Sequence, residues 1–222
     1  MSFINEEFYR AKVSHTEIDE LLENGWRHFG TYFYRYNFGL LEAEFRRVIV
    51  LRIRLADFQF SKSQRRILRK NSDLQTVIRP AEITPEKEDL FERHKSRFKR
   101  YIPNSIYDFL SAEPASLPCE ALEICVYRDN KLIAVSFFDV GMRATSSVYA
   151  MFAPEESSRS LGIFTLLLEI EWAKNHHKDF LYIGHVYEGN SFYDYKKRFR
   201  ALEKFDWEGG WETFTENDSG SI

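Results

Sequence analysis

The chain contains few cysteines and no long apolar run, and both absences limit what it can be. Only Cys119 and Cys125 occur among its 222 residues, which excludes a disulfide-stapled fold and a four-cysteine metal site. No stretch approaches the roughly 18 apolar residues that span a bilayer, and the N-terminus lacks a signal-peptide pattern. We therefore expect a cytoplasmic protein with no membrane segment, no cofactor and no metal, in which both cysteines are buried thiols.

Acidic residues are nearly absent from one basic stretch. Between Arg46 and Lys70 the sequence has nine basic residues and one acid, Asp57, although the net charge of the chain is −3. Such a local excess of positive charge repels itself unless an anion neutralises it, and a nucleic-acid backbone is the commonest large anion. We interpret the stretch as a nucleic-acid-binding surface; the alternative is a solvated face with salt bridges to the acidic second half.

The hydrophobic pattern predicts an α+β fold. Alternation predicts strands at 31–38, 46–60, 121–128, 131–140, 146–153 and 179–187, with Asp129-Asn130 as a hairpin turn. Helical spacing and capping residues predict helices at 16–26 (Thr16 as N-cap), 61–73, 85–99, 157–177 and 190–199. The second half should form a mixed β-sheet with packed helices, preceded by a smaller α/β part. Composition places the boundaries between an N-terminal region (1–78), a helical connector (79–118), a sheet domain (119–205) and a tail (206–222).

The element order of the second half resembles the N-acetyltransferase superfold. In that superfold, an Arg/Gln-x-x-Gly-x-Gly/Ala loop before a helix holds the pyrophosphate of coenzyme A on backbone N–H groups. Here the loop reads Arg159-Ser160-Leu161-Gly162-Ile163-Phe164. The resemblance implies an N-acetyltransferase-like catalytic domain at 119–205, whereas the bulky Phe164 would crowd a pyrophosphate.

A more specific resemblance covers roughly residues 20 to 205. The run SKSQRR at 61–66, with Arg69 and Asn71 after it, and the downstream segments SSRSLGIFTLLLEIEWA and YIGHVYEGNSFYDYKKRFRALE are similar to the aminoacyl-tRNA-protein transferases. These are the eukaryotic arginyl-tRNA-protein transferases and the bacterial aspartate/glutamate leucyltransferases. The resemblance implies an enzyme that moves arginine or leucine from charged tRNA to the amine of acidic protein N-termini, which marks those proteins for degradation in the N-degron pathway.

The cysteine cluster near the N-terminus of that family is missing. After Tyr34-Arg35 the sequence reads YNFGLLEAEFRR, with Tyr36 in place of the family's proline and no cysteine. A metal or iron–sulfur cluster held by relatives at this point therefore cannot be held by this stretch.

The basic run suits phosphate and sugar contacts with a tRNA acceptor end, and no DNA is expected as a partner. The residues assigned to aminoacyl-tRNA binding are Ser61, Ser63, Gln64, Arg65, Arg66, Arg69, Lys70 and Asn71.

Aminolysis of an aminoacyl ester needs little beyond positioning, one base and one oxyanion donor. Three residues are candidate catalytic groups: Asp139 on a predicted strand, and His185 and Glu188 at the carboxyl end of another. Each has a structural alternative, because Asp139 can cap a strand end and a lone histidine is often a core residue.

A further set is assigned to the aminoacyl or acceptor pocket. In this set a glycine permits close backbone approach, tyrosines stack on the terminal adenosine, and cations read an acceptor carboxylate. The set is Tyr149, Arg159, Ser160, Gly162, Tyr182, Gly184, Tyr187, Tyr195, Lys196 and Arg198. Ordinary aromatic core and a solvated helix face are the alternatives.

Two other functions stay open. The chain can be a non-catalytic relative that binds tRNA or protein, or a coenzyme A-dependent N-acetyltransferase. The donor amino acid is open as well, because an arginine donor needs an acid such as Asp139 or Glu188, whereas a leucine donor needs an apolar pocket.

Overall fold

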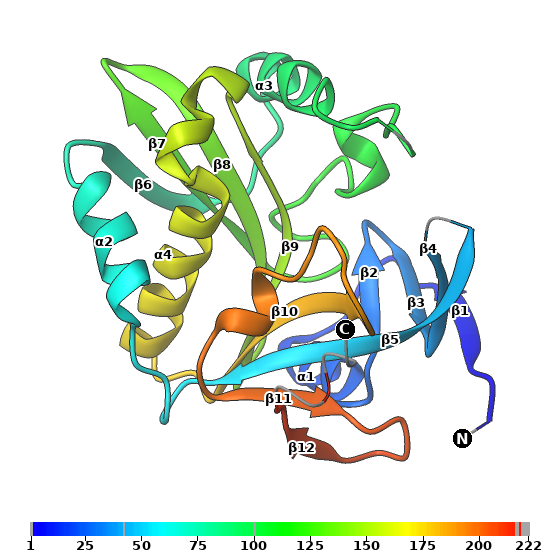
Figure 1. The fold of residues 1–222 in the computed structure, drawn as a ribbon. Coiled ribbons are helices and arrows are strands. Elements are labelled where there is room, and N and C mark those ends of the chain that lie inside the picture. The colour runs from blue at the N-terminus through cyan, green and yellow to red at the C-terminus, as the bar shows by residue number, and fades with distance from the viewer. Residues whose placement is uncertain (1, 42, 100, 216–217, 219–222) are drawn as a thin grey trace.

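The computed structural model describes residues 2–41, 43–99, 101–215 and 218, which form two sheets and four α-helices (Figure 1). The large sheet contains β4 (Phe38–Leu41), β5 (Glu44–Arg54), β6 (Gln75–Pro80), β7 (Ala121–Arg128), β8 (Lys131–Val140), β9 (Ala144–Phe152), β10 (Phe180–Tyr187), β11 (Leu202–Phe205) and β12 (Trp211–Thr213). Its strand order is β12-β11-β5-β10-β9-β8-β7-β6, with β4 paired to β5 beside this path. The small sheet has the order β1-β3-β2, made by Asn5–Tyr9, Tyr32–Tyr36 and Arg27–Phe29 respectively.

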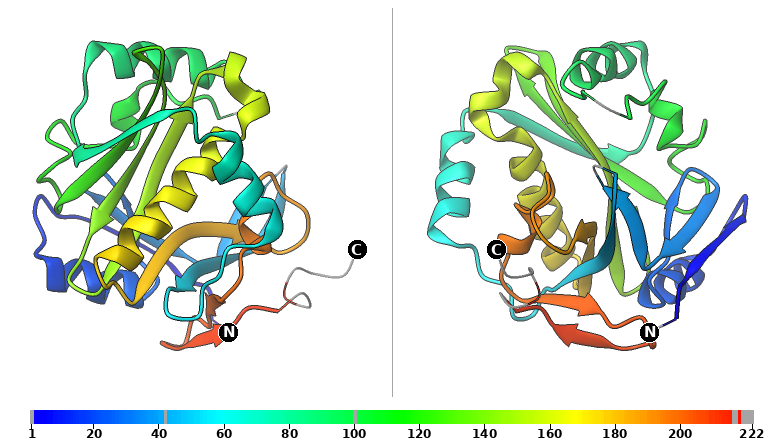
Figure 2. Two further views of the ribbon diagram at one scale, coloured as in Figure 1. Left: turned by 90° about the vertical axis from the view of Figure 1, so that its left-hand side faces the viewer. Right: turned by 45° about the vertical axis from the view of Figure 1, so that its right-hand side comes forward.

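Helices cover both faces of the large sheet (Figure 2). On one face α4 (Leu161–Asn175) packs Leu167 and Ile170 against strands β5 and β10, and α2 (Lys62–Lys70) lies on the outer side of α4. On the other face lie α3 (Pro85–Lys95), α1 (His15–Glu23) and the small sheet. Ile18 and Leu22 of α1 are fully buried against this second face, so the small sheet and α1 are docked on the large sheet rather than separate from it.

The strand β8 is the centre of the core. Nine of its ten residues are buried, because antiparallel neighbours β7 and β9 flank it and helices cover both of its faces. A strand covered on both faces reads as a continuous apolar run, and the nine buried residues LIAVSFFDV break that rule only at Ser136 and Asp139. The hairpin turn before it is confirmed, since Asp129 and Asn130 have φ of 51° and 62°.

One pair of strands in the large sheet is parallel. β10 pairs with β9 only where Phe180–Tyr182 faces Ala144–Ser146, and further along no pairing joins them, while β10 stays paired with β5 up to Tyr187. The register of β10 against β5 shifts between Tyr182 and Gly184, and Gly184 has a φ of +84°. A glycine adopts this conformation without the clash that a Cβ causes, so the register shift coincides with a residue whose backbone tolerates it.

A buried ion pair fixes α3 to the sheet. The Lys87 ammonium lies 2.6 Å from each carboxylate oxygen of Glu123 on β7, and both side chains are almost fully buried. Arg79 on β6 adds a second cation, with its Nε 2.8 Å from Glu123 Oε1. The pair is satisfied only while α3 and β7 keep this distance, so it links the helix to the core.

The α+β class and the mixed sheet with packed helices are confirmed, and several boundaries are wrong. The first helix is capped by Ser14 in a capping box with Glu17, not by Thr16, because the side chain of Ser14 accepts from the Glu17 N–H. The expected helix at 190–199 is only a 3-10 turn, Lys196–Arg198. The domain boundaries at 78, 118 and 205 stay predictions, and β5 and β6 from the first region are strands of the large sheet.

We expect Lys87→Met to lower the free energy of unfolding by about 3 kcal/mol, because it leaves the Glu123 carboxylate buried without its main partner. Urea unfolding measures this loss. The matched control is Lys95→Met on the same helix, which removes a solvent-accessible pair with Glu92 and should cost about 0.5 kcal/mol or less. Equal losses in the two variants would contradict the assignment.

Candidate active site

Four ionisable side chains from different elements meet where β9 and β10 diverge. They are Arg27 from β2, Glu169 from α4, His185 on β10 and Lys196 in the 3-10 turn. They come from separate parts of the chain but lie close in space. The charges of Arg27 and Lys196 affect the pKa of His185, and the charge of Glu169 affects the pKa of Lys196. We name these four residues the splay cluster.

Arg27 is a buried cation on the β9 side of the cluster. Its Nη1 donates to the Ser146 hydroxyl at 2.8 Å and its Nη2 donates to the carbonyl of Ser147. The residue is only 7% exposed, and among the described residues no carboxylate lies within 4 Å of it. A buried guanidinium remains charged, so Arg27 presents positive charge to the region between the strands.

Lys196 is the cation on the β10 side. Its Nζ lies 3.5 Å from the carbonyl oxygen of His185 and 3.2 Å from the position that a Cβ on Gly184 would occupy. Arg27 Nη2 lies 3.7 Å from the same position, so both cations sit over the glycine. Burial and the nearby Arg27 lower the pKa of Lys196 to about 7, against a smaller opposite effect of Glu169.

Glu169 is a carboxyl group on the buried, largely apolar face of α4. It is 1% exposed, and its burial raises its pKa to about 7, an effect that Ser136, Ser147 and Arg27 only partly offset. Its oxygens make no hydrogen bond within the described part of the chain. A carboxyl group held in this way gains or loses a proton near neutral pH.

His185 completes the cluster as a neutral imidazole. Burial and the cations Arg27 and Lys196 lower its pKa to about 3. The Tyr34 and Tyr36 rings pack edge-to-face with it, with centroids 5.9 and 5.3 Å away. Its Nε2 is buried and has no hydrogen-bond partner in the described residues, so one ring nitrogen is left unsatisfied.

Of the expected pocket residues, Gly184 adjoins the splay cluster directly, and the tyrosines lie around it or in the core. Tyr187 contacts Tyr36, and Tyr149 has a buried hydroxyl with no partner in the part of the chain that is described, while its ring stacks on Phe109 with centroids 4.0 Å apart. Gly184 lies below the two cations. By contrast, Tyr182 is in the core against α1 and hydrogen-bonds Arg52. Tyr195 packs near Phe199 and close enough to Glu169 for that carboxylate to affect its pKa, and Arg198 is exposed.

The other two candidate catalytic residues are not members of the splay cluster, although Asp139 lies near it, since its charge affects the pKa of Arg27 and of Glu169. The Asp139 carboxylate is 2% exposed and lies 2.9 Å from Nε2 of His28, whose Nδ1 donates to the Gly30 carbonyl. Cys119 adds a third ligand-type atom, and the three lie within 4.8 Å of one another. Because His28 and Asp139 hydrogen-bond each other directly, these two side chains form a hydrogen-bonded pair with Cys119 beside them. Glu188 is exposed, and its N–H bonds the Arg47 carbonyl.

The basic helix α2 is capped and anchored by the polar residues of the SKSQRR segment. Ser61 and Gln64 form a capping box, and the Asn71 amide donates to the carbonyls of Ile67 and Arg159. Its five cations, Lys62, Arg65, Arg66, Arg69 and Lys70, are all exposed. None of these five forms an ion pair with a described carboxylate. The alternative interpretation, salt bridges to the acidic second half, therefore does not apply to this helix.

The loop before α4 is occupied by structural contacts. Arg159 makes two 3.0 Å hydrogen bonds to the Asp73 carboxylate, and Lys70 donates to the Ser158 carbonyl, so this loop is tied to the end of α2. Ser160 has a φ of 57° and does not cap the helix with its side chain. Phe164, at the position where a coenzyme A-binding loop has glycine or alanine, is 4% exposed in the core.

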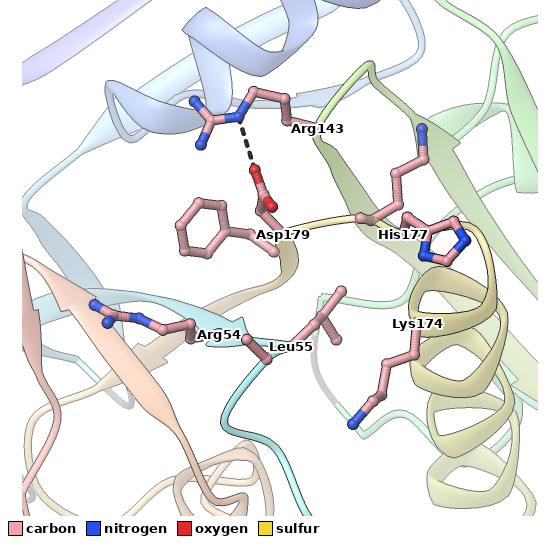
Figure 3. A pocket seen from close by; sticks show the side chains of 9 residues that line it. Arg54, Leu55, Arg143, Lys174, His177 and Asp179 are labelled. Atoms are coloured by element: carbon pink, nitrogen blue, oxygen red, sulfur yellow. Dashed lines mark hydrogen bonds and ion pairs between the residues drawn. The ribbon is translucent and has the colours of Figure 1, made fainter.

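A surface pocket of about 520 Å³ lies at the opposite end of β10 (Figure 3). Basic side chains line much of it, namely Arg54, Arg143, Lys174, His177 and Lys178. Arg143 pairs with Asp179, Arg54 pairs with Glu203 and Asp57, and the two lysines donate to backbone carbonyls. These engaged cations leave the splay cluster as the stronger candidate site.

A mixed sheet in which the parallel strands β9 and β10 diverge beside the long helix α4 is the arrangement expected of an N-acetyltransferase-like fold. Among solved structures, the C-terminal domain of a putative lysylphosphatidylglycerol synthetase from Agrobacterium fabrum is similar in fold. Its TM-score is 0.50 at 14% identity, covering 82% of this chain and 55% of that one. No helix in the described ranges is long and apolar enough to cross a membrane.

Sequence comparison identifies the family. Residues 3–66 match the N-terminal and residues 83–206 the C-terminal part of the arginine-tRNA-protein transferases. An aspartate/glutamate leucyltransferase of Campylobacter jejuni is 29% identical over 191 residues, covering 83% of this chain and 78% of that protein. The corresponding protein of Xanthomonas euvesicatoria is 33% identical over 184 residues, covering 74% and 70%. The chain belongs to the arginine-tRNA-protein transferase family and is a tRNA-dependent aminoacyltransferase, as its sequence predicts.

Half of the splay cluster was not predicted from the sequence. Arg27 stands in the short segment GWRHFG, where nothing marks it as a residue that reaches β9. Glu169 had a usable signal, since it interrupts the apolar run LLLEI at a position that faces the sheet. His185 and Lys196 were found through the resemblance, together with Gly184.

We expect Gly184→Ala to reduce aminoacyl transfer at least 10-fold, because its Cβ would meet Lys196 Nζ at 3.2 Å, on top of a backbone strain of about 1–2 kcal/mol. Gly209→Ala is the control, since Gly209 also has a positive φ but a Cβ there meets nothing within 4 Å. Thermal unfolding and initial rates separate strain from function. Equal activity losses would show that strain alone is responsible.

Proposed function

We propose that this enzyme transfers leucine from charged tRNA to the N-terminal amine of proteins that begin with aspartate or glutamate. Both relatives described above are aspartate/glutamate leucyltransferases, which supports the donor and the acceptor. The charge of the splay cluster agrees, since Arg27 and Lys196 would repel the side chain of an arginine donor. The product carries a new N-terminal leucine, which would serve as a degradation signal in the cytoplasm.

The tRNA surface in this proposal is the exposed face of α2. The helix carries five cations and no acid, and Lys62 is at its first position, where the positive end of the helix dipole disfavours a cation. Five such charges without an acidic partner are stabilised by a polyanion that lies along them. This is the observation that most strongly supports a tRNA substrate.

The acceptor site in this proposal is the buried cation Arg27, beside Lys196. Arg27 has two N–H groups engaged with Ser146 and Ser147 and others available, and a carboxylate is the partner that compensates a desolvated guanidinium best. An aspartate or glutamate at the acceptor N-terminus brings a carboxylate within a few bonds of the reacting amine. Binding that carboxylate therefore also positions the nucleophile.

The chemistry is aminolysis of an ester. The acceptor amine attacks the ester carbonyl, an oxyanion forms, and the bond to the terminal ribose oxygen breaks to leave an amide. Tyr34, whose pKa burial raises to about 12, stays protonated and pairs with Arg27 across β2 and β3, so its hydroxyl is the oxyanion donor in this proposal. The coenzyme A alternative is not supported, because Phe164 fills the core at the pyrophosphate loop.

Radiolabelled leucine or arginine transferred from charged tRNA to peptides beginning with Asp, Glu or Ala tests the proposal. We expect leucine to be transferred to the Asp and Glu peptides and at least 10-fold less to the Ala peptide. Transfer of arginine instead would overturn the donor assignment. Tight tRNA binding without transfer of either amino acid would identify a non-catalytic relative.

We also expect Arg66→Gln/Arg69→Gln to weaken tRNA binding and to reduce the slope of log K against log salt concentration by about 1 for each phosphate that α2 no longer neutralises. Filter binding across a salt series measures both. The control is Arg93→Gln/Lys95→Gln on α3, which removes the same charge from cations already paired with Asp89, Glu155 and Glu92. A slope lowered equally by both double variants would point to net charge rather than to α2.

A further inference from the structure

The acceptor N-terminus carries a proton that must leave before it can attack, and the structure restricts which group takes it. A free α-amine has a pKa of about 7.7 to 8.0, so the ammonium form is common at neutral pH. The acceptor of this proton must be unprotonated near pH 7 and must reach the region between β9 and β10. Each ionisable group near this region can be judged on both conditions.

Most candidates meet only one condition. His185 has its pKa lowered to about 3, which makes its imidazole a weak base. Glu169 is 1% exposed and lies beneath the sheet on the α4 side. Asp139 is in contact with His28, and Glu188 is exposed beyond the end of β10.

Lys196 meets both conditions. Its Nζ lies above Gly184 beside Arg27, and it makes only a long contact, 3.5 Å, to the His185 carbonyl. The neighbouring Lys197 is different, since its Nζ is paired with Asp194 at 2.9 Å and donates to the Gly189 carbonyl at 2.6 Å. One of two adjacent lysines is therefore held in an ion pair while the other is directed to the splay cluster without one in the described structure.

We propose that the Lys196 side chain is the proton carrier of the transfer reaction, while Arg27 holds the acceptor carboxylate. This inference rests on the proposed function. In its neutral form, the Lys196 amine takes one proton from the acceptor ammonium, and the freed amine attacks the ester carbonyl. The Lys196 ammonium then gives a proton to the departing ribose oxygen as the C–O bond breaks. The second amine proton, released when the amide forms, passes to the Lys196 amine and from it to solvent, which restores the neutral side chain.

The surroundings of Lys196 suit this cycle. Arg27 from β2 disfavours its charged form, Glu169 from α4 favours it, and the Tyr193 ring lies 5.3 Å from Nζ on the loop side. His185 on β10 is neutral and contributes its carbonyl rather than a charge. With its pKa lowered to about 7, Lys196 exists in comparable amounts as amine and ammonium at neutral pH.

The test compares Lys196→Ala and Lys196→Arg with the wild-type enzyme in the leucine transfer assay, with tRNA binding measured in parallel. Both variants should lose at least 100-fold in kcat, because arginine keeps the charge but does not release its proton near pH 7. KM for the acidic peptide should change about 3-fold or less, since in this proposal Arg27 binds the carboxylate. Lys197→Ala is the matched control and should retain kcat.

Chemical rescue distinguishes proton transfer by Lys196 from a purely structural role, because an added amine cannot restore a structural contact. Trimethylamine cannot form an amide, so any recovery of peptide product in Lys196→Ala reports proton transfer alone. We expect recovery that increases with the unprotonated fraction of the added amine and no effect on Lys197→Ala. Full activity of Lys196→Arg, a rise in KM with unchanged kcat, or no rescue at any amine concentration would each overturn the proposal. An inactive wild-type enzyme would instead contradict the proposed function itself.

Discussion

The divergence of β9 and β10 is the constraint on which the rest of the structure depends. Two parallel strands that separate inside a sheet expose backbone groups that a continuous ladder would satisfy. Here side chains take part in that task, because Arg27 donates to the Ser147 carbonyl on β9 and Lys196 approaches the His185 carbonyl on β10. The two cations that satisfy these carbonyl groups thereby place positive charge inside the sheet, where it can act on a bound substrate.

Holding two cations at such a place requires support from several elements. Gly184 keeps the space over β10 empty of side chain, β2 presents Arg27 from the small sheet, and α4 supplies Glu169 from the opposite face. The small sheet therefore does more than cover the core. Its docking through Phe33, beside Ile18 and Leu22 of α1, sets the position of Arg27 relative to β9.

Much of the fold was predictable from local patterns, and the site only in part. Alternation identified the central strands, and Asp129-Asn130 identified the hairpin between β7 and β8, because both signals depend on neighbouring residues. The segment 190–199 looked helical but folds as turns, in which the Asp194 carboxylate accepts from the Ser191 N–H and hydroxyl while Tyr195 and Phe199 pack into the core. Arg27 was missed because its function depends on contacts with Ser146 and Ser147, about 120 residues away, which no local pattern encodes.

The helix α2 has a further consequence for how ionic strength acts on the molecule. Its five cations repel one another without internal acidic partners, and its ends are held by the Ser61–Gln64 capping box and the contacts of Asn71. Dissolved salt screens that repulsion and so favours the folded helix, while the same screening weakens its attraction for a polyanion. Folding stability and substrate affinity thus respond to salt with opposite signs at one element.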